Sequence, residues 1–470
     1  MSHLFISAAH KSSGKTTISI GLTAAYNQLN HKVQTFKKGP DYIDPMWLGR
    51  AAGEPCYNLD FYTMQENEIR HCFNQHMENA NLGIIEGNKG LYDGLDLDGS
   101  NSNAALAHLL GAPVILVIDS RGMTRGIAPL VLGYQNFDSN INIQGVILNQ
   151  VGGSRHESKL RAILEHYTDV KVLGAVHKNN DLDIDERHLG LIPSNEEHEA
   201  DKKILSIANN IKDQVNLDQL IDIANHTTKQ TTTETTAPVT LKSNNTNSIK
   251  IGIFKDKAFG FYYPDDLNTL QEAGAELVYI NSLKDKSLPP IDGLFIGGGF
   301  PESMMQQLNE NNSLRTAVKS AVENGLPTYA ECGGLMYLSR SISWNDTKHE
   351  MAGVIDGDIL MHERPQGRGY IQLQETDTHP WQTHTSEGTI FAHEFHYSEL
   401  VNLDQEYQYA YKVLRGAGID GKHDGLIYKN LLANYAHLRN TQNNQWAIRF
   451  IAFINDHLIG NPLKSFVSQT

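Results

Sequence analysis

Residues 4–22 read LFISAAHKSSGKTTISIGL, and this stretch decides the fold of the first half of the chain. An apolar run, a serine-rich turn and an amphipathic run follow one another, which predicts a buried strand, a tight loop and a helix. The loop ends in a match to the last part of a P-loop, at Gly14, Lys15, Thr16 and Thr17. In such a loop, backbone amides and the lysine hold phosphate, and the threonine hydroxyl binds Mg²⁺. Because Ala9 replaces the first glycine of the pattern, a strand–turn–helix unit without a ligand is the alternative.

The same alternation of short apolar runs and amphipathic runs continues through both halves of the chain. The apolar runs include LGIIEG, PVILVIDS and IQGVILNQV in the first half, and KIGIF, DGLFIGGG and LPTYAEC in the second. Buried strands that alternate with helices predict parallel sheets with right-handed crossovers. We therefore expect an α/β protein made of two doubly wound parallel-sheet domains, with ligands at the carboxyl ends of the strands.

The length of the chain and one biased segment predict the domain boundaries. A chain of 470 residues is too long for one ordinary core. Residues 226–248 are rich in Thr and Asn and poor in large apolar side chains, so they cannot bury enough surface to offset their ordering entropy. We expect a first domain over 1–225, a linker over 226–248 and a second domain over 249–470.

The composition excludes several classes of protein. A net charge of -15 disfavours nucleic acid and membrane surfaces as partners, because both favour a basic face. Three cysteines without a CxxC pair give neither a disulfide framework nor a zinc site. The N-terminus lacks the pattern of a signal peptide, and no apolar run is long enough to span a bilayer. We expect a cytoplasmic protein, and a homodimer is compatible with the sequence.

Acidic residues follow two other predicted strands of the first half. FKKGPDYIDP carries Asp41 and Asp44, and LGIIEGNKGLYDG carries Glu86 directly after an apolar run. Carboxylate oxygens at strand ends are suited to bind Mg²⁺ beside a phosphate loop. Each acid alone could be an ordinary turn residue, but together with GKTT they indicate a nucleotide site. Lys37 and Lys38 of FKKG could add positive charge to a phosphate site, although a pair of lysines is more often solvated.

The second half contains a candidate nucleophile in TYAECGGLM, residues 328–336. Cys332 lies at the end of a predicted strand and precedes Gly333. This resembles a nucleophile elbow, where a sharp turn projects the side chain and the next N–H stabilises an oxyanion. The upstream turn GGGFPE contains Gly298 and Gly299, whose N–H groups can also face an anion. A packed core thiol is the alternative for any lone cysteine.

A cysteine nucleophile also needs a base. The histidines available in this half include His362, His393, His396, His423 and His437, and His437 in ANYAHLRN follows a strand-like run near the C-terminus. Cys56 and Cys72 lack neighbouring glycine turns, so we interpret them as packing residues.

Taken together, these stretches resemble the cobyrinate a,c-diamide synthase family over essentially the whole chain. The resemblance is carried by SSGKTT, FKKGPDYIDP, YNLD, EGNKGLYDG, LLGAPVILVIDSRGM, GVILNQVG, ERHLGLIP, FYYPDDL, GGGFPE, AECGGLMYL and HEFHYS. It implies an N-terminal domain similar to dethiobiotin synthetase and a C-terminal domain similar to class I glutamine amidotransferases. It further implies a ligase of cobalamin biosynthesis that uses ATP, Mg²⁺ and glutamine to amidate the a and c acetate carboxylates of cobyrinate, a corrin-type macrocycle, through an acyl phosphate.

The resemblance also implies roles for single residues. Phosphate and nucleotide contacts are implied for Gly14, Lys15, Thr16, Thr17 and Asn149. Mg²⁺ ligation is implied for Thr16, Asp41 and Glu86. Contacts to the substrate or to the phosphoryl intermediate are implied for Tyr42 and Asp44. Attack on glutamine falls to Cys332, with His437 as its base and an oxyanion site at Gly298, Gly299 and Gly333. HEFHYS, with His393 and His396, lines either the site of the second domain or the domain interface.

Two departures from the pattern of related proteins bear on these roles. Class I amidotransferases usually carry a glutamate two residues after the histidine, where this chain has Arg439. We therefore expect a Cys–His dyad, with slow glutamine hydrolysis when the first domain is empty. Lys11 and Ser12 stand where relatives often have Gly or Ser-Gly, and Lys11 could reach the phosphates.

Several alternatives remain open at the level of sequence. Nickel-sirohydrochlorin or hydrogenobyrinate could replace cobyrinate in the same chemistry. Cobyric acid synthase shares both domains, although the GPDYIDP loop fits the a,c-diamide group better. From other classes, a non-catalytic P-loop ATPase switch has no use for a cysteine elbow, and a plain cysteine hydrolase has no use for Lys15.

Overall fold

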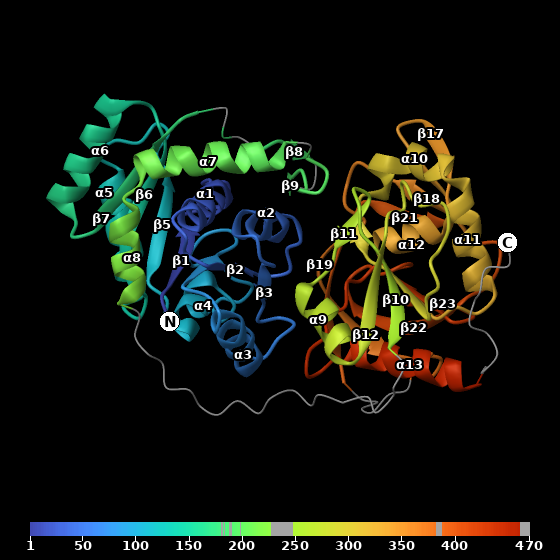
Figure 1. Ribbon diagram of the computed structural model, residues 1–470. Coiled ribbons are helices and arrows are strands. Elements are labelled where there is room, and N and C mark those ends of the chain that lie inside the picture. Colours follow the sequence, from blue (N-terminus) through green and yellow to red (C-terminus); the bar gives the residue numbers. More distant parts are fainter. Residues whose placement is uncertain are drawn as a thin grey trace. The chain divides into compact units, whose positions relative to one another are not determined.

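A computed structural model (Figure 1) describes the following parts of the chain: residues 1–179, 182, 184–187, 190–197, 199–226, 248–381 and 388–460. The chain forms two compact units, Met1–Thr236 and Ala237–Thr470. Nearly all of the expected linker, residues 227–247, lies outside the described residues. Within the described ranges, no helix has the length and apolar character that a membrane span requires.

The first unit is built on a seven-stranded parallel sheet, as the alternation predicts. In sheet order its strands are β3 (Tyr57–Leu59), β2 (Val33–Lys38), β4 (Leu82–Glu86), β1 (His3–Ala8), β5 (Val114–Asp119), β6 (Ile143–Val151) and β7 (Lys171–His177). The neighbours β2, β4 and β1 all end at the same edge of the sheet. The three stretches singled out in the sequence therefore meet there, at a position where doubly wound sheets bind ligands.

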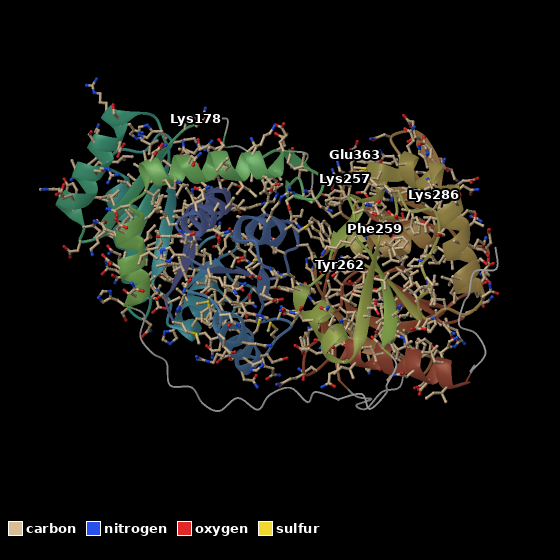
Figure 2. The ribbon with its side chains drawn as sticks, in the orientation of Figure 1. Lys178, Lys257, Phe259, Tyr262, Lys286 and Glu363 are labelled. Carbon is tan, nitrogen blue, oxygen red and sulfur yellow. The ribbon has the colours of Figure 1, made fainter. Side chains whose placement is uncertain are left out.

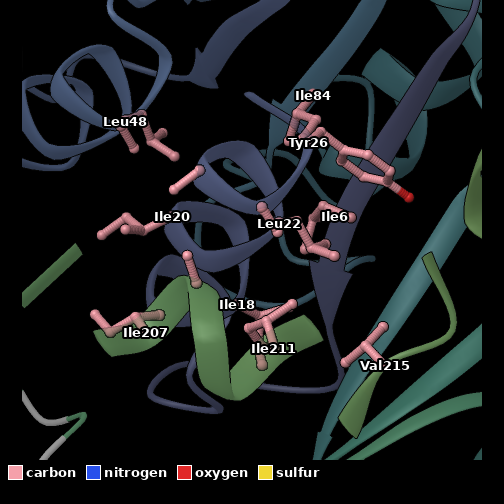
Figure 3. Close-up of a cluster of buried hydrophobic side chains, with 14 of the residues drawn as sticks. Ile6, Ile18, Ile20, Leu22, Tyr26, Leu48, Ile84, Ile207, Ile211 and Val215 are labelled. Atoms are coloured by element: carbon pink, nitrogen blue, oxygen red, sulfur yellow. The ribbon is translucent and has the colours of Figure 1, made fainter. Parts of the chain in front are cut away.

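Helices cover both faces of this sheet. They are α1 (Lys15–Gln28), α2 (Ile43–Ala52), α3 (Glu66–Met77), α4 (Asn103–Leu110), α5 (Ile127–Phe137), α6 (Ser154–Tyr167), α7 (Ala200–Gln214) and α8 (Leu217–Asn225), and β8 (Glu186–Arg187) and β9 (Gly190–Leu191) form a short antiparallel pair. Because side chains alternate along a strand, Leu4 and Ile6 of β1 enter one core and Phe5 enters the other. Figure 3 shows part of the first core, where α1 and α7 pack together.

The contact between α1 and α7 depends on Gly21. A Cβ at this position would lie 2.4 Å from Cγ1 of Ile211 and 2.9 Å from Cγ2 of Ile207. Overpacking of this kind costs about 1–3 kcal/mol, against a gain of about 1 kcal/mol for alanine over glycine in a helix. We expect Gly21→Ala to lower the unfolding temperature of the first unit by a few degrees. Gly133 lies in an exposed turn of α5 with open space around it, so Gly133→Ala should raise the unfolding temperature. Equal changes in the unfolding temperatures of the two variants would contradict this packing.

The second unit is built on a nine-stranded sheet. In sheet order its strands are β12 (Ala275–Ile280), β10 (Ile249–Phe254), β13 (Gly293–Ile296), β15 (Thr328–Glu331), β24 (Leu431–Asn434), β23 (His423–Tyr428), β22 (Gln408–Arg415), β19 (Gly367–Glu375) and β20 (Ile390–His396). The strands from β12 to β24 are parallel, and those from β24 to β20 are antiparallel.

The α/β class is thus confirmed, but the second sheet is mixed rather than parallel throughout. The antiparallel part has a simple cause, since no described helix separates these strands and a parallel pair needs a long crossover. Two smaller sheets complete the unit, one of β11 (Phe259–Phe261) with β14 (Gly298–Gly299), and one of β17 (Thr347–Glu350), β16 (Ser339–Trp344), β18 (Ile355–Met361) and β21 (Ser398–Val401). The helices are α9 (Pro264–Glu272), the 3₁₀ helix η2 (Pro301–Met304), α10 (Met305–Glu310), α11 (Asn312–Glu323), α12 (Gly333–Leu338) and α13 (Trp446–Gly460).

Candidate active sites

The glycine-rich loop of the first unit joins β1 to the N-terminus of α1. Gly14 precedes the first turn of the helix with a φ of 87°, a left-handed conformation that favours glycine. Asn149, at the end of β6, donates from Nδ2 to the carbonyl oxygen of Ser13 at 2.9 Å, and a Cβ at Gly14 would lie 2.1 Å from that nitrogen. Asn149 therefore supports the loop backbone. The helix N-terminus beside it, with Thr17 half-buried in the first turn, offers unpaired amides of the kind that bind phosphate.

Lys15 is buried at the start of α1. Its Nζ donates to the carbonyl oxygen of Lys89 at 2.6 Å, within the loop that follows β4. The side chain of Asn103 holds this loop by donating to the carbonyl oxygens of Asn88 and Gly90. Burial, together with repulsion from a nearby lysine, lowers the pKa of Lys15 to about 8. A buried cation with a carbonyl as its hydrogen-bond partner is suited to receive an anion.

Three carboxylates and a hydroxyl gather at the ends of β2 and β4. Lys37 and Glu86 are partners on these neighbouring strands, and Nζ of Lys37 lies 2.5 Å from Oε1 of Glu86. The same Nζ lies 2.5 Å from Oδ2 of Asp44 and 3.7 Å from Oδ2 of Asp41. The hydroxyl of Thr16 donates to Glu86 at 3.0 Å and to Asp44 at 3.3 Å. The structure thus brings Thr16 and all three predicted acids into one cluster.

Of the two acids of GPDYIDP, Asp44 rather than Asp41 contacts Thr16. Oδ1 of Asp41 accepts from the backbone N–H groups of Ile43 and Asp44, so this carboxylate caps the first turn of α2. Asp44 lies inside that turn and projects toward α1. Tyr42, between the two acids, is buried.

The buried lysines of β2 differ from the expectation that they are solvated. Lys37 and Lys38 are each 2% exposed, because every residue of β2 is covered on both faces. Lys38 donates to the backbone and side-chain oxygens of Asn101, at 2.5 and 3.2 Å. Both lysines end the stretch VQTFKK, and recognition of this stretch as a buried strand would have predicted that they are buried.

Burial and the neighbouring charges shift the pKa values of the groups in this cluster. Burial opposes the charge on Lys37, but the neighbouring carboxylates outweigh it and raise the pKa of the lysine well above its usual range. Burial raises the pKa of Asp41 to about 7 and also raises the pKa of Glu86. For Asp44, burial is outweighed by Lys37, which lowers the pKa of this acid.

The donor set of the cluster fits Mg²⁺. Oε2 of Glu86 is buried and has no hydrogen-bond partner among the described residues. A hydroxyl and several carboxylates are the oxygen donors that Mg²⁺ prefers. Thr16, Asp44 and Glu86 are therefore the residues that could hold it, beside a loop that can hold phosphate.

The second unit places Cys332 at a sharp turn between β15 and α12. The cysteine has φ 47° and ψ −101°, a conformation that non-glycine residues rarely adopt and that is found at functional sites. Its backbone N–H donates to the carbonyl oxygen of Asn434 at 2.7 Å. Gly334 allows the turn to pack on β13, since a Cβ there would lie 2.1 Å from the carbonyl oxygen of Ile296. This geometry is that of the predicted nucleophile elbow. Burial, with nearby acids, raises the pKa of the Cys332 thiol.

The glycine turn predicted to face an anion lies directly beside this elbow. β14 pairs with β11, so that Gly299 is opposite Phe259. Gly299 has a φ of 156°, and a Cβ on it would lie 2.1 Å from the carbonyl oxygen of Ala258. A Cβ on Gly333 would lie 3.0 Å from the backbone nitrogen of Gly299, which shows how closely the two glycine segments approach. Tyr262 fixes the start of the turn by accepting from the N–H of Gly297 at 2.9 Å, and Figure 2 labels Phe259 and Tyr262 in this region.

His437 reaches the same place from the segment after β24. The buried carboxylate of Asp424 holds that segment by accepting from the N–H groups of Tyr435 and Ala436, at 2.9 and 2.8 Å. The imidazole lies against the glycine turn, since a Cβ on Gly298 would be 2.5 Å from Cε1 and 3.4 Å from Nε2 of His437. Burial lowers the pKa of His437 to about 3, so the ring is neutral near pH 7.

A carboxylate also lies beside His437, although residue 439 is an arginine. Oε2 of Glu331 is 3.4 Å from Nδ1 of the imidazole. The dyad was predicted from the residue two positions after His437 alone, so an acid from another part of the chain was not foreseen. That residue, Arg439, instead donates to Asp265 at 2.5 Å.

The two histidines of HEFHYS contact the segment that carries His437. His393 pairs through its backbone with His437, whose N–H donates to the carbonyl oxygen of His393 at 2.7 Å. His396 stacks on Tyr435, with ring centroids 3.9 Å apart.

Comparisons with known proteins agree with these two sites. Residues 5–192 match the model of the CobQ/CobB/MinD/ParA nucleotide binding domain, and residues 250–445 match that of the CobB/CobQ-like glutamine amidotransferase domain. The chain is 43% identical over 446 residues to a cobyrinate a,c-diamide synthase of Magnetococcus marinus, and the match covers 94% of this chain and 95% of that protein.

This chain belongs to the cobyrinate a,c-diamide synthase family. Other members are similarly related over nearly their full length. The enzyme of Methanosarcina acetivorans is 39% identical, with 93% of this chain and 92% of that protein covered. The enzyme of Dehalococcoides mccartyi strain CBDB1 is 38% identical, with 96% and 98% covered. The resemblance predicted from the motifs is thus confirmed.

Proposed function

We propose that this chain, like the family named above, amidates the a and c acetate carboxylates of cobyrinate with ammonia taken from glutamine and with energy from ATP. The observation that carries the proposal is the presence of two complementary sites in one chain. A phosphate loop with buried acids forms one, and a cysteine elbow with a histidine and a glycine turn forms the other. A ligase that makes its own ammonia needs both.

In the second unit, the proposed reaction releases ammonia from glutamine. His437 takes the proton of the Cys332 thiol, and the sulfur attacks the carbon of the side-chain amide. The backbone amides of Gly299 and Gly333 face the oxyanion that forms on the former carbonyl oxygen. The carbon–nitrogen bond then breaks, the proton passes from His437 to the departing nitrogen, and a thioester remains that water hydrolyses to glutamate.

In the first unit, the proposed reaction activates a carboxylate of the macrocycle. The carboxylate oxygen attacks the γ-phosphorus of ATP, the bond to ADP breaks, and an acyl phosphate forms. Ammonia then attacks the acyl carbon and phosphate leaves, which yields the amide. Lys15 and the amides at the start of α1 would hold the phosphates. Thr16, Asp44 and Glu86 would hold Mg²⁺, which supplies positive charge against the phosphate oxygens when bound.

Coupling between the two sites distinguishes this proposal from a P-loop switch. We expect phosphate release from ATP to need cobyrinate together with a nitrogen source, and to rise when glutamine is added to cobyrinate and MgATP. The measurement is the rate of phosphate release with each component left out in turn. A steady rate of ATP hydrolysis that depends on neither cobyrinate nor glutamine would contradict the proposed ligase.

A further inference from the structure

The buried acid that precedes the nucleophile in the chain has a defined orientation. Glu331 is 3% exposed and is the last residue of β15. Its Oε1 accepts from the phenol hydroxyl of Tyr329 at 2.5 Å and from the backbone N–H of Leu438 at 2.9 Å. Its Oε2 is the atom 3.4 Å from Nδ1 of His437. One oxygen is therefore anchored by two donors, and the other faces the imidazole.

The anchoring groups come from β15, from β24 and from the segment that follows β24. β15 and β24 are parallel partners, with Glu331 opposite Asn434. The side-chain amide of Asn434 donates to the hydroxyl of Tyr329 at 3.1 Å, and Tyr329 is fully buried. Because side chains alternate along a strand, Tyr329 and Glu331 share one face of β15. A chain of hydrogen bonds thus runs from Asn434 through Tyr329 to Glu331, whose second oxygen lies 3.4 Å from Nδ1 of the candidate base.

We propose that Glu331 is a positioning residue that sets the tautomer of His437 and so enables this histidine to take the proton of Cys332. The inference rests on the proposed glutamine hydrolysis and names a residue that completes it. It assigns to position 331 the part that a glutamate two residues after the histidine takes in other class I amidotransferases, a place occupied here by Arg439.

The two protonation states of Glu331 have opposite effects on the imidazole. An ionised Oε2, 3.4 Å from Nδ1, favours the tautomer that carries its proton on Nδ1, so that the lone pair lies on Nε2, on the side of the glycine turn. A protonated Oε2 donates to Nδ1 and leaves the proton on Nε2, so the ring cannot act as a base there. Only the ionised acid gives the productive tautomer.

The pH dependence follows from the surroundings of Glu331. Burial raises its pKa to about 8, while the hydrogen bonds from Tyr329 and Leu438 lower it. The titratable groups that face Glu331 from the elements packed around it are Tyr329, His437, Cys332, Tyr262, Asp266 and Tyr411. Since the active form is the ionised one, glutamine hydrolysis should increase as pH rises through about 8.

Glu331→Gln tests the proposal without a change of shape. Tyr329 and Leu438 both donate to Oε1, so they fix the carbonyl oxygen of the new amide there and turn its NH₂ group toward Nδ1 of His437. The amide then donates, and the wrong tautomer results. We expect kcat for glutamate release by the full chain to fall about 10²–10⁴-fold, with KM for glutamine within a few-fold of the unchanged protein. Amidation of cobyrinate with free ammonia should persist.

Two further variants separate positioning from mere support of the fold. Glu331→Asp keeps the charge and should restore part of the activity. Tyr329→Phe removes a donor that favours the ionised acid, so the rise of kcat/KM with pH should shift to higher pH. Glu323→Gln, at an exposed carboxylate at the end of α11, serves as the matched control and should change nothing.

The outcomes separate this inference from the proposed function. Glutamate release by Glu331→Gln at the rate of the unchanged protein, with the same pH profile, would overturn the role of Glu331 while leaving the ligase in place. Absence of glutamate release by the unchanged chain in the full reaction mixture would instead overturn the proposed function.

Discussion

Cys332→Ala is expected to abolish glutamine-dependent amidation and to leave amidation by free ammonia intact. Without the sulfur no thioester can form, so glutamate release should fall by about 10⁵-fold or more, as in other enzymes that lose their nucleophile. The phosphate loop and its acids lie in the first unit, and their hydrogen bonds do not involve this residue. The measurement is glutamate release and macrocycle amidation in parallel, with either glutamine or ammonium as the nitrogen source.

The two other cysteines provide matched controls for this prediction. Cys56 and Cys72 are also buried thiols, but both lie in the cores of the first unit. Their replacement by alanine should lower stability slightly and leave the dependence on glutamine unchanged. If Cys332→Ala still used glutamine, or if it lost ammonia-dependent activity as well, the separation of the two half-reactions proposed here would be wrong.

Lys15→Ala is expected to slow amidation about 10²–10³-fold with both nitrogen sources. Lys15 is buried and is the first residue of α1, so its ammonium group belongs to the same turn as the amides that would bind phosphate. Loss of one such group that stabilises developing charge lowers a rate by about 10²–10³-fold. The unit should still fold, because removal of a buried charge also removes its desolvation penalty. The rate of amidation with ammonium, at saturating ATP and cobyrinate, measures this effect.

A surface lysine offers the comparison for this second prediction. Lys32 lies 3.7 Å from Glu54 in an exposed ion pair, which is worth little to stability. Lys32→Ala should keep full activity. Ammonia-dependent amidation by Lys15→Ala within a few-fold of the unchanged protein would contradict the assignment of this loop to ATP.

The features that the sequence predicted are those specified by neighbouring residues. GKTT after an apolar run specifies a loop at a helix N-terminus, and AECGG specifies a turn that only small residues after the cysteine permit. Glu86 could be placed near the loop because parallel strands end at the same edge. These inferences needed only local pattern and the topology of an α/β sheet.

The features that the sequence missed depend on the register between distant segments. Lys37 is buried because β2 is covered on both faces, and the distant Glu86 joins the nearby Asp41 and Asp44 around its ammonium group. Glu331 faces His437 because β15 and β24 are neighbours in a particular register. The antiparallel half of the second sheet escaped prediction because its strands are more polar and follow one another without helices.

The most direct test of the account is mass spectrometry of cobyrinate after incubation with the full chain, MgATP and glutamine labelled at its amide nitrogen. The account predicts that two carboxylates become amides and that both carry the label. It also predicts that unlabelled ammonium added in excess dilutes the label without reducing the number of amides formed. A corrinoid that stays unchanged under these conditions, while the chain binds ATP and folds normally, would contradict the central claim.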